Sequence, residues 1–162
     1  MSTQTSGMTV HKAITVACPA EQAFATFTDG ITSLWPLGTH SVGQTRARSA
    51  VFEGRVGGRL YEAWDDGTEC DWGRILIWEP PRRFVMAWQI THTWGYEPDL
   101  AKSSEVEVRF TPESGGSTRV DIEHRYFNRH GEGGDTMRTA VDAPNGWSGL
   151  LQLFAAQAQQ TN

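Results

Sequence analysis

Residues 143–159, APNGWSGLLQLFAAQAQ, form the amphipathic segment around which the rest of the chain is organised. Starting from Trp147 and ending at Ala158, apolar side chains recur at positions i, i+3, i+4, i+7, i+8 and i+11. This spacing places them on one face of a helix, with serine and glutamine side chains largely on the other. A helix with one apolar face needs a partner surface, and we expect a sheet formed by the residues before it.

The chain before this helix consists largely of short runs that alternate between apolar and polar residues. The alternation predicts strands at residues 8–18, 49–53, 59–64, 69–78, 84–90, 105–110 and 119–126. Two short helices are expected after the first strand, at 20–28 and 31–35, and an extra helical turn at 136–142. Residues 38–48 have no period and are expected to form a loop. Short turns between most of the strands predict antiparallel neighbours.

The composition limits the class of protein. A length of 162 residues with 38% apolar residues predicts one domain, at residues 8–160, after a disordered polar tail at 1–7. The net charge of −5 argues against nonspecific binding to nucleic acid or to an anionic membrane. The sequence has no membrane-spanning run and no signal-peptide pattern at its start, so we expect a cytoplasmic protein. Cys18 and Cys70 are expected to be reduced thiols.

Several short motifs, taken in their order along the chain, resemble those of the START-like (SRPBCC, Bet v 1-like) superfamily. More narrowly, they resemble the family related to the activator of the heat-shock protein 90 ATPase. The motifs are ACPAEQAF at 17–24, WP at 35–36, RVGG at 55–58, DG at 66–67, WGRI at 72–75, EPPRRF at 79–84, SEV at 104–106, TRV at 118–120 with His124, and GW at 146–147.

This resemblance covers nearly the whole chain and implies an α+β helix-grip fold. In that fold a curved antiparallel sheet of six to seven strands wraps around a long C-terminal helix and encloses an internal cavity. The superfamily includes lipid carriers, hormone receptors, cyclases, hydrolases and co-chaperone domains, so the fold does not determine the function.

Seven tryptophans are spread over the whole chain, which suits a large core or an aromatic-lined pocket. The strand phases and the helix face predict an inward set of residues. The residues that we expect to line a cavity for a small, largely apolar ligand are Trp35, Trp64, Trp72, Met86, Trp88, Trp94, Phe110, His124, Trp147, Leu151 and Phe154. Among these, Trp35, Trp64, Trp72 and Trp94 are the candidates for the cavity mouth. The alternative is an interior that is filled by side chains.

His124 continues the face of Val120 and Ile122, so its side chain should point inward. It is either a neutral core histidine bonded to a nearby group, a polar contact for a cavity ligand, or a general acid or base. Glu53, Glu62 and Asp71 are each candidates for a carboxylate partner, and the pattern leaves open which face they occupy.

Other reactive side chains give weaker indications of a catalytic or metal site. The Cys70 thiol has no evident base beside it, which argues against a catalytic cysteine. The spacing of His130, Glu132 and Asp135 fits no standard metal site, and a solvated loop is expected there. We therefore expect no catalytic set, no metal and no cofactor.

A dimer contact is suggested by the strand at 69–78. Leu76 and Trp78 are expected to lie opposite Ile75 and Ile77, and an exposed Leu76–Trp78 pair would suit a homodimer. The alternative is that the N-terminal helices or a loop cover this pair.

Three functions remain open. The first is binding of a small apolar molecule in the cavity, which we favour because only loose acid and base candidates are present. The second is a chaperone-linked interaction module in the stress response, as the resemblance implies. The third is a cavity enzyme of the cyclase or hydrolase type, which would need a paired acid and base.

Overall fold

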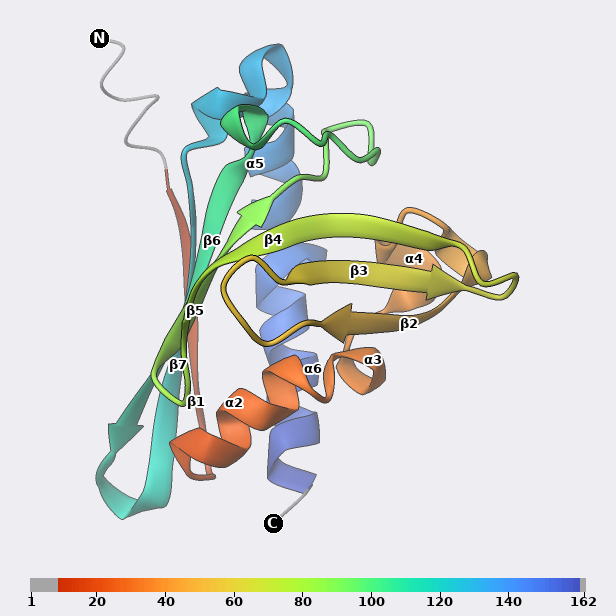
Figure 1. The fold of residues 1–162 in the computed structure, drawn as a ribbon. Coiled ribbons are helices and arrows are strands. Elements are labelled where there is room, and N and C mark those ends of the chain that lie inside the picture. The colour runs from red at the N-terminus through yellow and green to blue at the C-terminus, as the bar shows by residue number, and fades with distance from the viewer. Residues whose placement is uncertain (1–8, 161–162) are drawn as a thin grey trace, which may run out of the picture.

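The computed structural model describes residues 9–160, so the tail expected at 1–7 lies outside the described residues. Within this range the chain forms seven strands in one sheet, five α-helices, a π-helical turn and short 3-10 turns (Figure 1). The strands are β1 (Val10–Val16), β2 (Ala47–Phe52), β3 (Arg59–Trp64), β4 (Glu69–Glu79), β5 (Arg83–Trp88), β6 (Ser104–Glu113) and β7 (Ser117–Arg125). The helices are α2 (Ala20–Thr28), α3 (Ile31–Leu34), α4 (Leu37–His40), α5 (Gly134–Asp142) and α6 (Gly149–Gln160).

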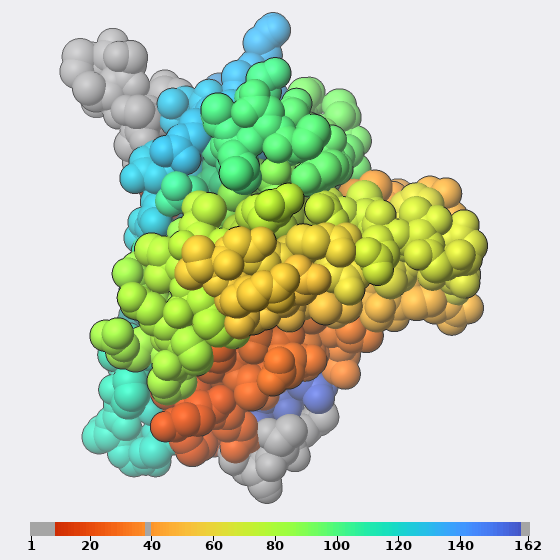
Figure 2. Space-filling model, viewed as in Figure 1, coloured from red at the N-terminus to blue at the C-terminus, as the bar shows by residue number. Residues whose placement is uncertain are grey.

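All neighbouring strands are antiparallel, in the order β1-β7-β6-β5-β4-β3-β2. In Figure 1, β1, β7 and β6 run alongside α6, whereas β3 and β2 cross in front of it. The space-filling view shows that β2, β3 and the start of β4 project from the body as an arm (Figure 2). The predicted α+β helix-grip fold, with a curved sheet around the C-terminal helix, is confirmed.

Two bulges in β4 help the sheet to bend, because an extra residue on one strand increases the local twist. The register shifts between Leu60 and Tyr61 where β3 meets β4, and between Ile75 and Ile77 where β4 meets β5. The second bulge makes strict alternation wrong for this strand. Trp78 pairs with the inward Phe84, while Leu76 is 36% exposed.

The exposed Leu76–Trp78 pair is therefore not formed. The Trp78 ring lies 5.1 Å from that of Phe24 between centroids and packs against the core. The homodimer stays a prediction, without the patch that suggested it. The outer face of β6 and β7 is instead charged, because Arg125 forms ion pairs with glutamates from both strands, Glu105, Glu107 and Glu123.

The inward-facing set predicted from the strand phases is confirmed by burial. The side chains of this set are all buried: Phe84, Met86, Trp88, Val106, Val108, Phe110, Val120, Ile122, Trp147, Leu150, Leu151 and Phe154. They form one continuous core between the sheet, α2 and α6. No helix within residues 9–160 is long and apolar enough to cross a membrane.

The single helix expected across 143–159 is wrong at its N-terminal end. A π-helical turn, η5 (Pro144–Ser148), separates α5 from α6, and the backbone at Gly146 is non-helical, with φ −85° and ψ −129°. A side chain at Gly146 would meet the Val141 carbonyl oxygen at 2.2 Å, so the close approach of these two turns requires glycine. Trp147 therefore stands on the turn, ahead of the helix.

The segment 38–48, which was expected to be a loop, contains regular secondary structure. It contains the end of α4, a 3-10 turn η1 (Gln44–Arg46) and the start of β2 at Ala47. Short helical turns of this kind leave no hydrophobic period, because only one or two of their side chains face the core.

Candidate functional site

A cavity of about 350 Å³ lies between the strands β4 and β5 and the segments α4–η1, α5 and η5. This volume is within the range of small-molecule sites in proteins. Its walls are mainly apolar and aromatic. The lining residues are Trp35, His40, Ser41, Val42, Gln44, Trp72, Trp88, Ile90, Trp94, Ala140, Val141, Ala143, Asn145, Gly146, Trp147 and Leu150. This lining, taken from the described residues, includes no aspartate, glutamate, lysine or arginine.

Five indole rings form much of the wall, and several are in contact with one another. The ring of Trp35 lies 5.0 Å from Trp72 and 6.1 Å from Trp147, measured between centroids. Trp147 in turn lies 5.5 Å from Trp88 in an edge-to-face arrangement. Trp94 stands at the open side, with 50% of its surface exposed.

Hydrogen bonds inside the protein hold three of these rings in place. The Trp35 indole N–H donates to the carbonyl oxygen of His40 at 3.0 Å. Trp72 donates to Glu62 at 2.5 Å, and Trp147 donates to His124 Nδ1 at 3.1 Å. Because each bond restrains the ring in its plane, the indole faces are fixed around the cavity.

Glu62 is fully buried on β3, and its carboxylate accepts four N–H groups. Besides Trp72, the donors are the backbone N–H groups of Val42 and Gly43, at 2.8 and 2.7 Å, and the Trp64 indole at 2.6 Å. A buried carboxylate is costly unless such donors surround it. Glu62 therefore ties the segment after α4 to the sheet and is not the partner of His124.

His124 is bonded through both ring nitrogens. The Trp147 indole can only donate, so His124 Nδ1 accepts and Nε2–H donates to Ser104 Oγ at 2.7 Å. The Ser104 hydroxyl then donates to His130 Nε2, also at 2.7 Å. Complete burial holds the pKa of His124 well below its ordinary value, and the neighbouring His130 lowers it further. Of the three alternatives for His124, the geometry supports the neutral core histidine.

His130 belongs to this chain of hydrogen bonds, so the solvated loop expected for it is wrong at this position. It lies in η4 (Phe127–Gly133), half-buried against Ser104. Burial lowers the pKa of His130, and the nearby His92 adds to the shift. The three groups together position Trp147 from behind the cavity wall.

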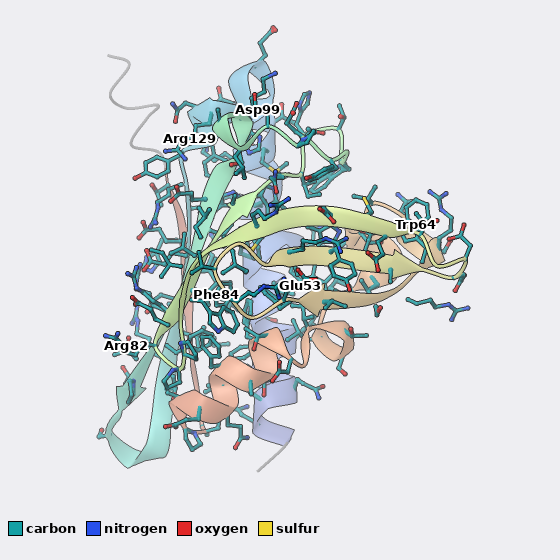
Figure 3. The ribbon with its side chains drawn as sticks, in the orientation of Figure 1. Glu53, Trp64, Arg82, Phe84, Asp99 and Arg129 are labelled. Atoms are coloured by element: carbon teal, nitrogen blue, oxygen red, sulfur yellow. The ribbon has the colours of Figure 1, made fainter. Side chains whose placement is uncertain are left out.

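The predicted ligand-binding residues fall into three places. Trp35, Trp72, Trp88, Trp94 and Trp147 line the cavity. Met86, Phe110, Leu151 and Phe154 lie in the packed interior, and His124 stands behind Trp147. Trp64 sits near the tip of the arm, far from Phe84 at the centre of the sheet (Figure 3), with the Arg46 guanidinium 4.1 Å from its ring centroid.

Sequence reasoning missed the polar part of the lining. His40 Nε2–H donates to the Asn145 backbone carbonyl at 2.9 Å, which joins α4 to the η5 turn across the cavity rim. His40 lies in a segment without periodicity and Asn145 lies ahead of the first periodic residue, Trp147, so no pattern in the sequence marked them. Cys70 is outside the lining, and burial raises the pKa of its thiol to about 11, helped by the charges of Glu62 and Asp71.

Comparison with known proteins places the chain in a family. The model of the family described as activator of Hsp90 ATPase homolog 1-like protein (AHSA1) matches residues 17–158. The chain belongs to this family. No curated protein matches this AHSA1-like chain.

Solved structures share the fold of this AHSA1-like chain. The anthrahydroquino-γ-pyrone synthase Txn09 is 40% identical, covering 91% of this chain and 95% of its own, with a TM-score of 0.65. The self-sacrificing resistance protein CalC from Micromonospora echinospora is 27% identical over 95% and 96% of the two chains, also with a TM-score of 0.65. A Nitrosomonas europaea protein, at 14% identity over 96% of both chains and a TM-score of 0.67, shows the fold alone.

Proposed function

We propose that this AHSA1-like chain binds a planar, polycyclic aromatic molecule in the tryptophan-lined cavity. The observation that carries the proposal is the wall of five indole rings around about 350 Å³, whose described lining residues include no carboxylate, lysine or arginine. Flat aromatic ligands gain most from such walls, because offset stacking adds to the burial of apolar surface. Three of the rings are held by internal hydrogen bonds, so little ordering is left for the ligand to impose.

The comparison with Txn09 supports the same class of ligand. Its name describes the synthase of an anthrahydroquino-γ-pyrone, which is a fused-ring compound, and it is 40% identical to this chain. The chaperone-linked role in the stress response, by contrast, rests on the family name alone.

A cyclase is the second candidate, and a specific residue favours it. His40 lies in the cavity lining, where its Nε2–H donates to the Asn145 carbonyl and so orients the imidazole. An imidazole is the side chain most often used as a general base. A phenolic oxygen that closes a pyrone ring must lose its proton, and His40 would take it at the rim of the cavity.

Filling the cavity tests the binding function. The Ala140→Trp variant places a bulky ring in the lining, and Thr139→Trp places the same ring on the exposed side of the same helix. Thermal shift with a tricyclic aromatic such as fluorene should show stabilisation of the wild type and of Thr139→Trp, and none of Ala140→Trp. Equal stabilisation of all three proteins would place the ligand elsewhere and contradict the proposal.

The cyclase candidate needs a reaction readout. An ortho-hydroxyaryl β-diketone closes to a γ-pyrone when the phenolic oxygen attacks the distal carbonyl carbon and water leaves, so mass spectrometry detects the product. We expect the wild type to accelerate this closure and His40→Gln to lose about 10²-fold or more of the acceleration. Binding of the diketone with no acceleration would leave a binding protein and exclude the cyclase for this substrate class.

A further inference from the structure

A chain of hydrogen bonds links the cavity wall to the histidine of η4. The Trp147 indole donates to His124 Nδ1 at 3.1 Å, and Ser104 Oγ lies 2.7 Å from both His124 Nε2 and His130 Nε2. His124 and Ser104 are fully buried, whereas His130 is half-buried and can exchange protons with solvent. One end of this chain therefore borders the cavity, and the other end borders water.

The direction of donation along this chain is fixed while both histidines are neutral. An indole can only donate, so His124 Nδ1 accepts and its proton lies on Nε2. Ser104 accepts from His124 and donates its own hydroxyl hydrogen to His130 Nε2, which must be unprotonated to accept it. In the described part of the chain, these two imidazoles are the hydrogen-bond partners of the Ser104 hydroxyl. The chain is complete only while His130 is neutral.

Protonation of His130 puts a hydrogen on Nε2 and removes the acceptor at the end of the chain. The Ser104 hydroxyl is then left without an acceptor, which is costly in a buried group, unless it turns to His124 Nε2. That reversal moves the His124 proton to Nδ1, where it meets the Trp147 N–H. Trp147 is the member of the chain that lines the cavity, so its ring has space to turn away from His124.

The charged groups around His130 do not offset this conflict. η4 packs against α5, β6 and η2 (Leu100–Lys102). The charged side chains of η4 and of the nearby ends of these elements are Lys102, Glu105, Arg129, Glu132, Asp135 and Arg138. Glu105 already accepts from Arg125 and Arg129, and Asp135 lies 4.0 Å from Arg138. Burial lowers the pKa of His130, and the charge of His92 lowers it further, so its protonation requires acid.

We propose that proton uptake by His130 releases Trp147 from the cavity wall, so that the protein holds an aromatic ligand at neutral pH and releases it in acid. This proposal rests on the proposed function, since it assumes that such a ligand fills the cavity. The Trp147 ring contacts Trp35 and Trp88, at 6.1 and 5.5 Å between centroids. Turning it away breaks the wall at both neighbours and removes stacking surface from the ligand.

Fluorene tests this switch, because it has no group that titrates and any pH dependence must come from the protein. Dissociation constants are measured by fluorescence titration at pH 7.5 and 5.0, with circular dichroism as the check that the protein is folded at both. The wild-type constant should rise about threefold or more at pH 5.0, since one linked proton changes affinity by at most about tenfold per pH unit. Equal constants at both pH values overturn the switch.

Two variants locate the proton. In His130→Gln the amide oxygen can still accept from Ser104 but does not titrate, so binding at pH 7.5 should persist and the weakening in acid should disappear. His40→Gln removes the histidine that lines the cavity itself, and the weakening in acid should remain as in the wild type. A pH effect that survives in His130→Gln, or that vanishes in His40→Gln, overturns the switch and leaves aromatic binding intact.

The ligand-free wild type gives a second measurement that does not need a variant to fold. One indole N–H signal in ¹H–¹⁵N spectra should move upfield as the pH falls from 7.5 to 5.0, because Trp147 loses its acceptor. Indole signals that all stay in place overturn the switch. If fluorene does not bind at pH 7.5, the proposed function fails, and this titration then decides whether His130 controls Trp147.

Discussion

Aromatic rings fill one half of the interior and hold open the other. Near α2, rings pack edge to face in a cluster that we call the phenylalanine core. Its members are Phe24, Phe27, Phe52, Phe84, Phe110 and Phe154. The void beside this core is about 10 Å³, room for one water at most. Near η5, indoles surround about 350 Å³ instead.

One difference between the two halves is the polar atom that each indole carries. A phenylalanine ring has no group to satisfy, so it is free to settle against its neighbours until the space is filled. An indole carries an N–H that usually finds an acceptor when it is buried. In the cavity wall those acceptors are Glu62, the His40 carbonyl and His124, so three of the rings are tied to fixed partners and cannot turn to close the space.

The largest expected effect comes from breaking the filled half. Phe84 is fully buried at the centre of the phenylalanine core. Truncation by Phe84→Ala should lower the free energy of unfolding by about 3–5 kcal/mol, because the rigid surroundings cannot close the space. Chemical denaturation of the wild type and the variant measures this difference in unfolding free energy. A loss below about 1 kcal/mol would show that the surrounding side chains move to close the space and that this half is not rigidly packed.

A somewhat smaller effect is expected from removing the charge that supports the wall. Glu62→Gln replaces one acceptor oxygen by an NH₂ group that faces donors, which leaves buried N–H groups unpaired. We expect a loss of about 2–3 kcal/mol in unfolding free energy, together with weaker binding of fluorene. Glu53→Gln, which changes a partly exposed carboxylate of the same type, is the control.

Acid should destabilise the protein through the histidines that lie behind the cavity wall. The pKa of His124 is depressed in the folded state by burial, so the unfolded chain binds the proton more readily. Stability is therefore fully present above the unfolded pKa, about 6.5, and falls as the pH drops below it, by up to about 1.4 kcal/mol per pH unit for each such histidine. Burial also lowers the pKa of His130, so its protonation at low pH destabilises the folded state in the same way.

The check is the slope of unfolding free energy between pH 7.5 and 5. His124→Gln should flatten this slope even if its overall stability is lower. An unchanged slope would assign the acid sensitivity to other groups.

The smallest expected effect on stability is at the cavity mouth. Trp94→Ala removes a ring that is half exposed, so the unfolding free energy should change by less than about 0.5 kcal/mol. Binding of fluorene should still weaken several-fold, because the ring closes one side of the cavity. An effect on stability with no effect on binding would exclude Trp94 from the site.

Much of the fold was predictable from the sequence, because alternation and helical spacing report directly on which side chains are buried. The inward face of β5, β6 and β7 follows from it, as do the apolar residues of α6. The bulges in β4 were not predictable, because no residue type in this strand signals where an extra residue interrupts the pairing. They turn Trp78 inward and expose Leu76.

The site was predictable only in part, and for a similar reason. Large rings are visible in a sequence, so the five indoles of the wall were among the candidates. Their hydrogen-bond partners depend on the folded geometry. Nothing in the pattern showed that Glu62 would serve two tryptophans, or that His40 would reach Asn145.

The break at Gly146 has a consequence for how such a domain can diversify. Because the break at Gly146 separates α5 from α6, the α5 segment that lines the cavity can change in length or sequence without moving the helix that packs on the phenylalanine core. Selection for a new ligand and selection for a stable scaffold then act on different stretches of the chain. A domain divided in this way can acquire new chemistry while the scaffold stays intact.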